Sequence, residues 1–162
     1  MKSKKKFLEI TIPGRTTFRI KNLLLDLNGT LGLDGHLLDG VEKRLLNLRD
    51  SFNIYIMTAD THGTAKTLKK QLGVQFVPME KNYGMVQKLE FLKRIGEGST
   101  ITIGNGSNDV LMLKEAAIGI CVIGKEGASW EAVQNSDIIV QDINDALEML
   151  LNPKRVIATL RR

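Results

Sequence analysis

Short apolar runs alternate along most of the chain with longer segments in which apolar residues recur at helical spacing. An apolar run of a few residues that is bounded by turns is typical of a buried parallel strand. Strands are predicted to end near Leu27, Met57, Val77, Ile103, Val122 and Val140, and helices are predicted over residues 40–51, 63–72, 84–95, 109–117, 128–134 and 143–151. This alternation predicts an α/β fold with a central parallel sheet and right-handed crossovers.

The N-terminal segment has a different pattern. Two alternating stretches, residues 7–12 and 16–20, flank Pro13-Gly14-Arg15 and predict a β-hairpin with one apolar face. A two-stranded hairpin is marginal alone and needs a surface to pack on. We therefore predict three parts: an N-terminal hairpin extension over residues 1–21, a core domain over residues 22–152 and a C-terminal tail over residues 153–162.

Polar side chains end three of the predicted strands. Asp26 ends the first and is followed at once by a glycine turn, Thr58 ends the second, and Asn105 follows the strand that ends at Ile103. Asp109 lies four residues after Asn105, so a turn leading into a helix can aim both at one point. Each residue alone could cap its turn or helix. Because parallel strands bring their carboxyl ends to one edge, where such folds bind ligands, the regularity favours a shared site.

These motifs resemble those of the haloacid dehalogenase superfamily of phosphotransferases. Residues 26–30 match its first motif, Asp-x-Asp-Gly-Thr, except at Asn28, and residues 104–109 match its fourth, Gly-Asp-Gly-x-Asn-Asp, except at Asn105. Thr58 matches the second motif. Residues 58–61, Thr-Ala-Asp-Thr, and the two asparagines are most similar to a soluble, P-type-ATPase-like subgroup. The resemblance implies a Rossmann-like three-layer sandwich around the parallel sheet.

The resemblance also implies a set of roles. Asp26 would attack phosphorus and form an aspartyl-phosphate, since a carboxylate is already ionised at neutral pH and needs only positioning. The implied catalytic residues are Asp26, Asn28, Thr58 and a lysine. The implied Mg²⁺ ligands are Asp26, Asn28 through its carbonyl, Asn105 and Asp109, a set of the oxygen atoms that Mg²⁺ prefers. The implied phosphate-binding residues are Leu27, Asn28, Gly29, Thr58, Ala59 and Lys88, the first three through backbone N–H groups.

Two lysines are candidates for the third motif. Lys88 opens a predicted helix, and its distance to Gly104 fits the soluble subgroup. Lys81, in Pro78-Met79-Glu80-Lys81, resembles the Pro-x-x-Lys of the pumps. We favour Lys88. Asp34, His36 and Asp60 could face a substrate, and we leave them outside the core site.

The two asparagines decide between two functions. An amide at position 28 cannot carry a proton to the leaving group or from water. An amide at position 105 removes one negative charge from the metal site. The sequence therefore predicts a slow Mg²⁺-dependent phosphatase acting on a small phosphorylated metabolite. The alternative is a degenerate phosphate-binding or regulatory module of the same fold.

The spacing between motifs predicts a protein without a cap domain. Residues 30–41 form a short loop, and residues 72–88 have room only for one strand and the start of a helix. The nucleotide-binding insertion and membrane helices of the cation pumps are also missing from the sequence, so we do not expect a pump. Since an uncovered site would be open to water, we expect self-association into a homo-oligomer, with the hairpin over residues 7–20 as the candidate covering segment.

Composition limits the partners and the location. The chain has 162 residues, enough for one domain with a sizeable core, and a single cysteine, Cys121, in an apolar run where an inert buried thiol is expected. Its net charge is +5, but aromatic residues make up only 5% and do not interleave with the basic runs, so no nucleic acid is expected. No apolar stretch approaches a membrane span, and the basic residues 2–6 precede no long apolar region. We expect a cytoplasmic protein.

Overall fold

A computed structural model of the protein describes residues 7–60 and 64–162. Thr61, the first residues of the helix predicted at 63–72, and the basic residues 2–6 lie outside the described residues.

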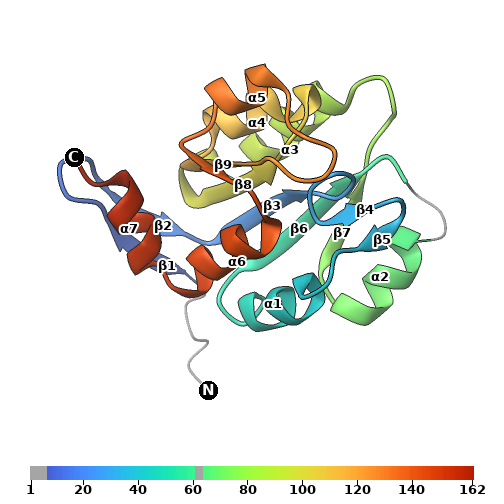
Figure 1. Cartoon of the computed structure of the whole chain (residues 1–162), viewed down its shortest axis with the longest axis horizontal. Coiled ribbons are helices and arrows are strands. Elements are labelled where there is room, and N and C mark those ends of the chain that lie inside the picture. The colour runs from blue at the N-terminus through green and yellow to red at the C-terminus, as the bar shows by residue number, and fades with distance from the viewer. Residues whose placement is uncertain (1–6, 61–63) are drawn as a thin grey trace.

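The centre of the fold is a six-stranded, entirely parallel sheet, with strand order β10-β9-β8-β3-β6-β7 (Figure 1). Its strands follow the predicted apolar runs: β3 (Asn22–Asp26), β6 (Asn53–Thr58), β7 (Gln75–Pro78), β8 (Thr100–Gly104), β9 (Ile118–Val122) and β10 (Ile138–Val140). The predicted α/β class and three-layer architecture are confirmed.

Helices cover both faces of this sheet (Figure 1). One face carries α3 (Gly84–Ile95), α4 (Val110–Glu115) and α5 (Trp130–Gln134), and the other carries α1 (Val41–Leu48), α2 (Thr64–Leu72) and α6 (Ile143–Leu151). Successive side chains of β3 point to opposite faces of the sheet and so pack against both helix layers. Leu24 packs with Phe91 of α3, whereas Leu23 and Leu25 belong to the core on the α1 and α6 side. The helix predicted over 109–117 is shorter, because it starts as a 3₁₀ turn, η2 (Ser107–Asp109). A further 3₁₀ turn, η1 (Glu97–Ser99), precedes β8.

The predicted hairpin is present and packs on its own chain. Strands β1 (Leu8–Thr11) and β2 (Thr17–Ile20) pair antiparallel, and Ile10 and Ile20 are completely buried in the main core. The segment predicted as a tail, 153–162, instead contains helix α7 (Lys154–Leu160), whose Val156 and Leu160 belong to that same core. The apolar face of the hairpin is therefore covered within the molecule, and the hairpin does not offer it to a neighbouring copy.

The loop after β3 contains a small hairpin, β4 (Gly32–Leu33) and β5 (His36–Leu37), which the sequence pattern did not predict. It lies at the carboxyl edge of the sheet (Figure 1). Asp34 and Gly35 at its tip have positive φ values of 50° and 82°, as a tight two-residue turn requires. Within residues 7–60 and 64–162 no helix is long and apolar enough to cross a membrane.

Candidate active site at the carboxyl edge of the sheet

Asp26 lies at the carboxyl edge of the sheet, at the end of a fully buried strand. All five residues of β3 are buried, because the strand lies between β6 and β8 and is covered by helices on both faces. Asp26 is the last of them, and its side chain keeps 9% exposure. The strand thus carries one carboxylate from the apolar core to the rim where loops begin.

The turn after Asp26 is tightly wound. The Leu27 carbonyl accepts hydrogen bonds from the N–H groups of Thr30, Leu31 and Gly32 at 3.3, 3.0 and 3.0 Å. Gly29 has φ +78°, a conformation that favours glycine, and its N–H donates to the Gly32 carbonyl at 2.8 Å. That N–H, which was predicted to bind phosphate, is therefore engaged inside the turn in this structure. The Asn28 side chain is exposed at its tip.

Lys88 joins Asp26 to Asp109. It lies on α3 with 0% exposure, and its Nζ donates to Asp26 Oδ1 at 2.8 Å and to Asp109 Oδ1 at 2.5 Å. A buried ammonium is tolerated only with such partners, so this geometry accounts for its position. The structure thus places Lys88, the favoured third-motif lysine, in the cluster. Lys81 lies exposed in the turn before α3 and does not reach the cluster, because that turn points into solvent.

Asp109 uses both of its carboxylate oxygens. Oδ1 accepts a hydrogen bond from Lys88 Nζ, and Oδ2 accepts hydrogen bonds from the backbone N–H groups of Asn105 and Gly106 at 2.9 and 3.0 Å. Gly104 permits this approach, since a Cβ there would lie 2.4 Å from Asp109 Cγ. Asp109 therefore holds the fourth-motif loop and Lys88 together, and its Oδ1 accepts one hydrogen bond, which leaves one lone pair of that oxygen for a metal ion.

The shared lysine determines how the cluster titrates. The pKa of Asp26 is raised from 3.8 to about 6: burial is the largest cause, the charge of Asp109 adds to the rise, and Lys88 and the Thr30 hydrogen bond oppose it. Burial alone would lower the pKa of Lys88, but the charges of Asp26 and Asp109 outweigh it, and that pKa is raised. Lys88 therefore stays protonated at neutral pH. Cys121 is an inert buried thiol, as predicted, since burial, assisted by Asp109, raises its pKa to about 11.

Thr58 lies at the same edge, one residue beyond the β6 position that pairs with Asp26. Its side chain is 3% exposed, and its hydroxyl accepts the Asp60 N–H at 3.0 Å. Ala59 is half-buried in the turn that follows. The second motif is thus adjacent to the first, which allows the Thr58 hydroxyl and the turn around Ala59 to face a group bound at Asp26.

Asn105 connects the first motif with a turn that the sequence did not single out. Its Oδ1 lies 3.3 Å from Thr30 Oγ1, which also donates to Asp26 Oδ2 at 3.0 Å. Its Nδ2 donates to the Gly127 carbonyl at 3.2 Å, and its backbone carbonyl accepts the Ser129 N–H at 2.8 Å. The turn after β9, over residues 124–127, is thereby tied to the site. Its glycines at both ends and its position after a strand were the signals available in the sequence.

The oxygen atoms around Thr30 fit a hard divalent cation. Asp26 Oδ2 and Asn105 Oδ1 lie within 3.0 and 3.3 Å of one hydroxyl oxygen, and the carbonyl of Asn28 belongs to the same turn. Mg²⁺ binds oxygen ligands of this type and retains several waters. No group of three or more His, Cys, Asp or Glu side chains among the described residues is arranged to hold a metal ion. A Mg²⁺ ion here would therefore take amide, carbonyl and water oxygens besides the carboxylates of Asp26 and Asp109.

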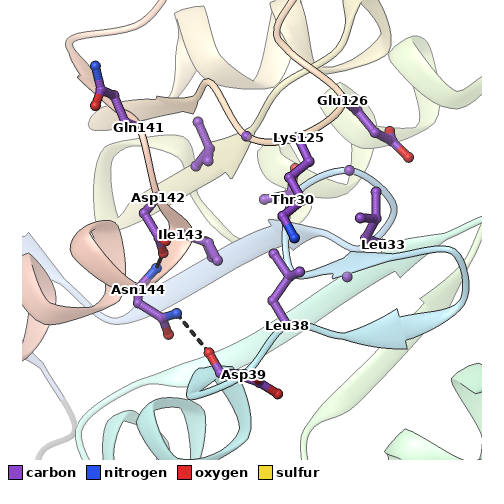
Figure 2. A pocket seen from close by; sticks show the side chains of 14 residues that line it. Thr30, Leu33, Leu38, Asp39, Lys125, Glu126, Gln141, Asp142, Ile143 and Asn144 are labelled. Carbon is purple, nitrogen blue, oxygen red and sulfur yellow. Dashed lines mark hydrogen bonds between the residues drawn. The ribbon is translucent and has the colours of Figure 1, made fainter.

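A cavity of about 380 Å³ opens beside these residues. Figure 2 shows its walls: Thr30, Leu33 and Leu38 come from the loop after β3, Lys125 and Glu126 from the turn after β9, and Asp142 and Asn144 from the start of α6. Asp26 does not line it, but Thr30 does, and the Thr30 hydroxyl is bonded to Asp26. The Thr30 hydroxyl thus connects the wall of the cavity with the Asp26 carboxylate. Its volume is in the range of small-molecule sites.

The fold is that of the haloacid dehalogenase enzymes. The deoxy-D-mannose-octulosonate 8-phosphate phosphatase of Haemophilus influenzae superposes with a TM-score of 0.69 and 16% identity, over 82% of this chain and 88% of that one. A putative HAD family hydrolase of Streptomyces avermitilis gives 0.64 and 14%, over 82% and 83%. The 3-deoxy-D-manno-octulosonate 8-phosphate phosphatase of Moraxella catarrhalis, in complex with magnesium ion, phosphate ion and KDO, gives 0.64 and 19%, over 88% and 94%. At these identities the likeness concerns the fold.

Sequence relatives give the closer relationship. No protein-family model matches the chain. The uncharacterized protein MJ0073 of Methanocaldococcus jannaschii is 50% identical over 80 residues, which are 47% of this chain and 86% of that protein. The phospholipid-transporting ATPase IH of Homo sapiens is 39% identical over 77 residues, 48% of this chain but only 6% of the pump. The chain belongs to the same family as MJ0073, its fold is that of the haloacid dehalogenase enzymes, and about half of it is similar in sequence to a segment of the P-type pump.

Proposed function

We propose that the protein is a Mg²⁺-dependent phosphatase that acts through an aspartyl-phosphate on a small phosphorylated metabolite. The observation that carries this proposal is the placement of Asp26. It is a buried carboxylate at the carboxyl edge of the sheet, held at one oxygen by Lys88 and at the other by Thr30. Such a carboxylate is fixed in direction and remains beside solvent, as a nucleophile requires.

The chemistry follows from this placement. Asp26 attacks phosphorus, the ester bond to the leaving oxygen breaks, and that oxygen takes a proton from water. A second water then attacks the aspartyl-phosphate, which releases phosphate and regenerates Asp26. Lys88 and the hydroxyl of Thr58 offset the negative charge that gathers on the transferring group. When bound, Mg²⁺ supplies further charge stabilisation at the same oxygens.

The asparagine at position 28 supports a slow reaction. Its side chain is exposed at the tip of the turn beside Asp26, where a carboxylate could exchange protons with the leaving oxygen and with water. An amide in that place holds neither proton. The leaving group and the attacking water must then exchange protons with solvent, which slows both halves of the reaction.

The test is hydrolysis of a generic aryl phosphate with Mg²⁺ and with EDTA, followed by a screen of phosphorylated metabolites. We expect slow, Mg²⁺-dependent release of phosphate. The cavity beside Thr30 supports substrates of metabolite size. If no substrate is hydrolysed with Mg²⁺ at enzyme concentrations near the substrate concentration, the phosphatase proposal fails.

A phosphate-binding or regulatory module is the second candidate, and the exposed amide of Asn28 is the observation that favours it. Such a module would bind inorganic phosphate or a phosphorylated ligand without turning it over. Calorimetry with phosphate separates the two, since binding without hydrolysis supports the module.

We further propose that the protein forms a homo-oligomer in the cytoplasm, where a reduced Cys121 would persist. The supporting feature is the uncovered carboxyl edge, where the hairpin β4–β5 is the main local cover in the described part of the chain. Light scattering across a concentration series tests this, and a monomer at every concentration would refute it.

A further inference from the structure

Glu126 lies over the first-motif turn although it is far from it in sequence. It belongs to the turn at residues 124–127, which is closed by the Gly127 N–H donating to the Gly124 carbonyl at 2.9 Å. Its Oε2 lies 2.3 Å from the point that a Cβ on Gly29 would occupy, and Asn105 Nδ2 lies 2.8 Å from the same point. The carboxylate therefore rests against the Gly29 backbone, beside the Asn105 side chain, in space that any residue other than glycine would fill.

Asn105 keeps Glu126 in this place. Its Nδ2 donates to the Gly127 carbonyl, one residue after Glu126, while its Oδ1 lies beside the Thr30 hydroxyl. An aspartate at position 105 would present two acceptor oxygens and no donor to that carbonyl. The amide is thus the side chain that can hold the turn and still offer an oxygen toward Asp26.

The buried cluster has too little negative charge to balance a divalent cation. Asp26 and Asp109 together carry two negative charges, and Lys88 neutralises one of them through its two ion pairs. A cation with two positive charges would therefore meet one net negative charge from these residues. Asn105 adds an oxygen but no charge. Among the described residues, Glu126 forms no ion pair within 4.0 Å that would cancel its own charge.

We propose that Glu126 supplies the second negative charge of the Mg²⁺ site and acts through a metal-bound water. This inference rests on the proposed function. A water-mediated role agrees with the absence, in the described residues, of three carboxylate or imidazole groups close enough to ligate one ion directly. It also agrees with the preference of Mg²⁺ for keeping several waters, which a nearby carboxylate can accept hydrogen bonds from.

The test measures Mg²⁺ affinity by isothermal titration calorimetry, without substrate. Glu126→Gln should weaken Mg²⁺ binding about tenfold, the size typical of outer-shell partners of a metal site. Glu131→Gln, which removes the same charge from an exposed position on α5, is the matched control and should bind Mg²⁺ as the wild type does. Circular dichroism and the melting temperature check that both variants fold.

A double-mutant cycle sharpens the test. In an Asn105→Asp background the new carboxylate replaces the missing charge and releases the turn from its amide donor. Glu126→Gln should then cost less than about threefold in Mg²⁺ affinity, because the two carboxylates serve the same purpose. An equal loss in both backgrounds would mean that Glu126 acts independently of position 105 and would overturn the inference.

The outcomes separate this inference from the proposed function. If the wild type binds Mg²⁺ and hydrolyses phosphate esters while Glu126→Gln binds Mg²⁺ equally well, the inference fails and the phosphatase stands. If the wild type binds no Mg²⁺ at millimolar concentration, both fail.

Discussion

The inner side of Asp26 faces Lys88 and Asp109, two charged residues with no exposed surface. Its outer side contacts Thr30, whose hydroxyl also lies beside Asn105, and Asn28 is exposed in the same turn. On the inner side every polar atom has a short, direct partner, and the arrangement is fixed by the core. On the outer side the contacts are longer and the groups nearest to Asp26 are neutral, with the Glu126 carboxylate lying farther out beside Asn105. The two sides therefore differ in function. The residues that hold the Asp26 carboxylate in place are all present, whereas the positions that could transfer protons during the reaction are occupied by amides.

The largest expected effect comes from removing the nucleophile. Asp26→Asn should abolish phosphate release, because an amide does not attack phosphorus, while far-ultraviolet circular dichroism should show the fold unchanged. Asp50→Asn, an exposed position near the opposite edge of the sheet, is the matched control and should keep full activity. Phosphate release by Asp26→Asn at the wild-type rate would show that the chemistry lies elsewhere.

The next effect tests the outer side. Asn28→Asp restores a carboxylate at the exposed tip of the turn and should raise the rate of dephosphorylation by about 10²–10⁴-fold, the usual range for general acid–base catalysis. Single-turnover kinetics measure this rate directly. Asn108→Asp adds the same charge at an exposed position of the fourth-motif loop and should not accelerate the reaction. An unchanged rate for Asn28→Asp would mean that proton transfer is not limiting.

The inner side is tested by its lysine. Lys88→Met leaves Asp26 and Asp109 as two buried carboxylates without a cation and should lower the free energy of unfolding by about 3–5 kcal/mol. Urea denaturation measures the loss. Lys81→Met, on the exposed turn before α3, is the control and should change stability by less than about 0.5 kcal/mol. Equal effects of the two substitutions would contradict the difference between buried and exposed lysines.

A smaller effect is expected from pH. The Asp26 carboxyl has a pKa of about 6 in the folded protein and 3.8 as its ordinary value, so between these values the folded state binds more protons than the unfolded state. The free energy of unfolding of the metal-free protein should therefore fall as pH rises from about 4 to about 6, by about 3 kcal/mol at about 1.4 kcal/mol per pKa unit. Denaturation in EDTA across this range measures the slope, and Asp26→Asn should lack this component. A variant with the same slope would assign it to other carboxyl groups.

Much of the fold could be predicted from the sequence, because its strands are apolar runs bounded by turns. The ends of β9 and β10 fall at Val122 and Val140 as predicted, and α3 and α6 have the predicted bounds. Helix α7 was missed, since residues 154–160 are short, polar at one end and helical mainly because Val156 and Leu160 pack into the core. The surface on which the apolar face of the hairpin packs could not be predicted either, because α7 contributes to the same core.

The site shows a similar division. Motif spacing predicted that Asp26, Thr58 and Asp109 would meet at one edge, and it favoured Lys88 over Lys81. It could not show that the two carboxylate oxygens of Asp109 accept hydrogen bonds from Lys88 and from two backbone N–H groups. Nor could it bring Glu126 to Gly29, since that contact depends on strand β8 lying between β3 and β9 in the sheet. Pairings between distant turns follow from strand order, which the local pattern does not contain.

The packing of α7 on the N-terminal hairpin has a consequence for how the chain folds. The Arg162 N–H donates to the Pro13 carbonyl at 3.1 Å, and residues of α7 and of the hairpin belong to one core cluster. In Figure 1, α7 lies beside the hairpin. The contact between the hairpin and α7 therefore forms only after a loop of nearly the whole chain has closed. Because this contact joins residues that are far apart in the sequence, docking of α7 on the hairpin is expected to be a late event in folding.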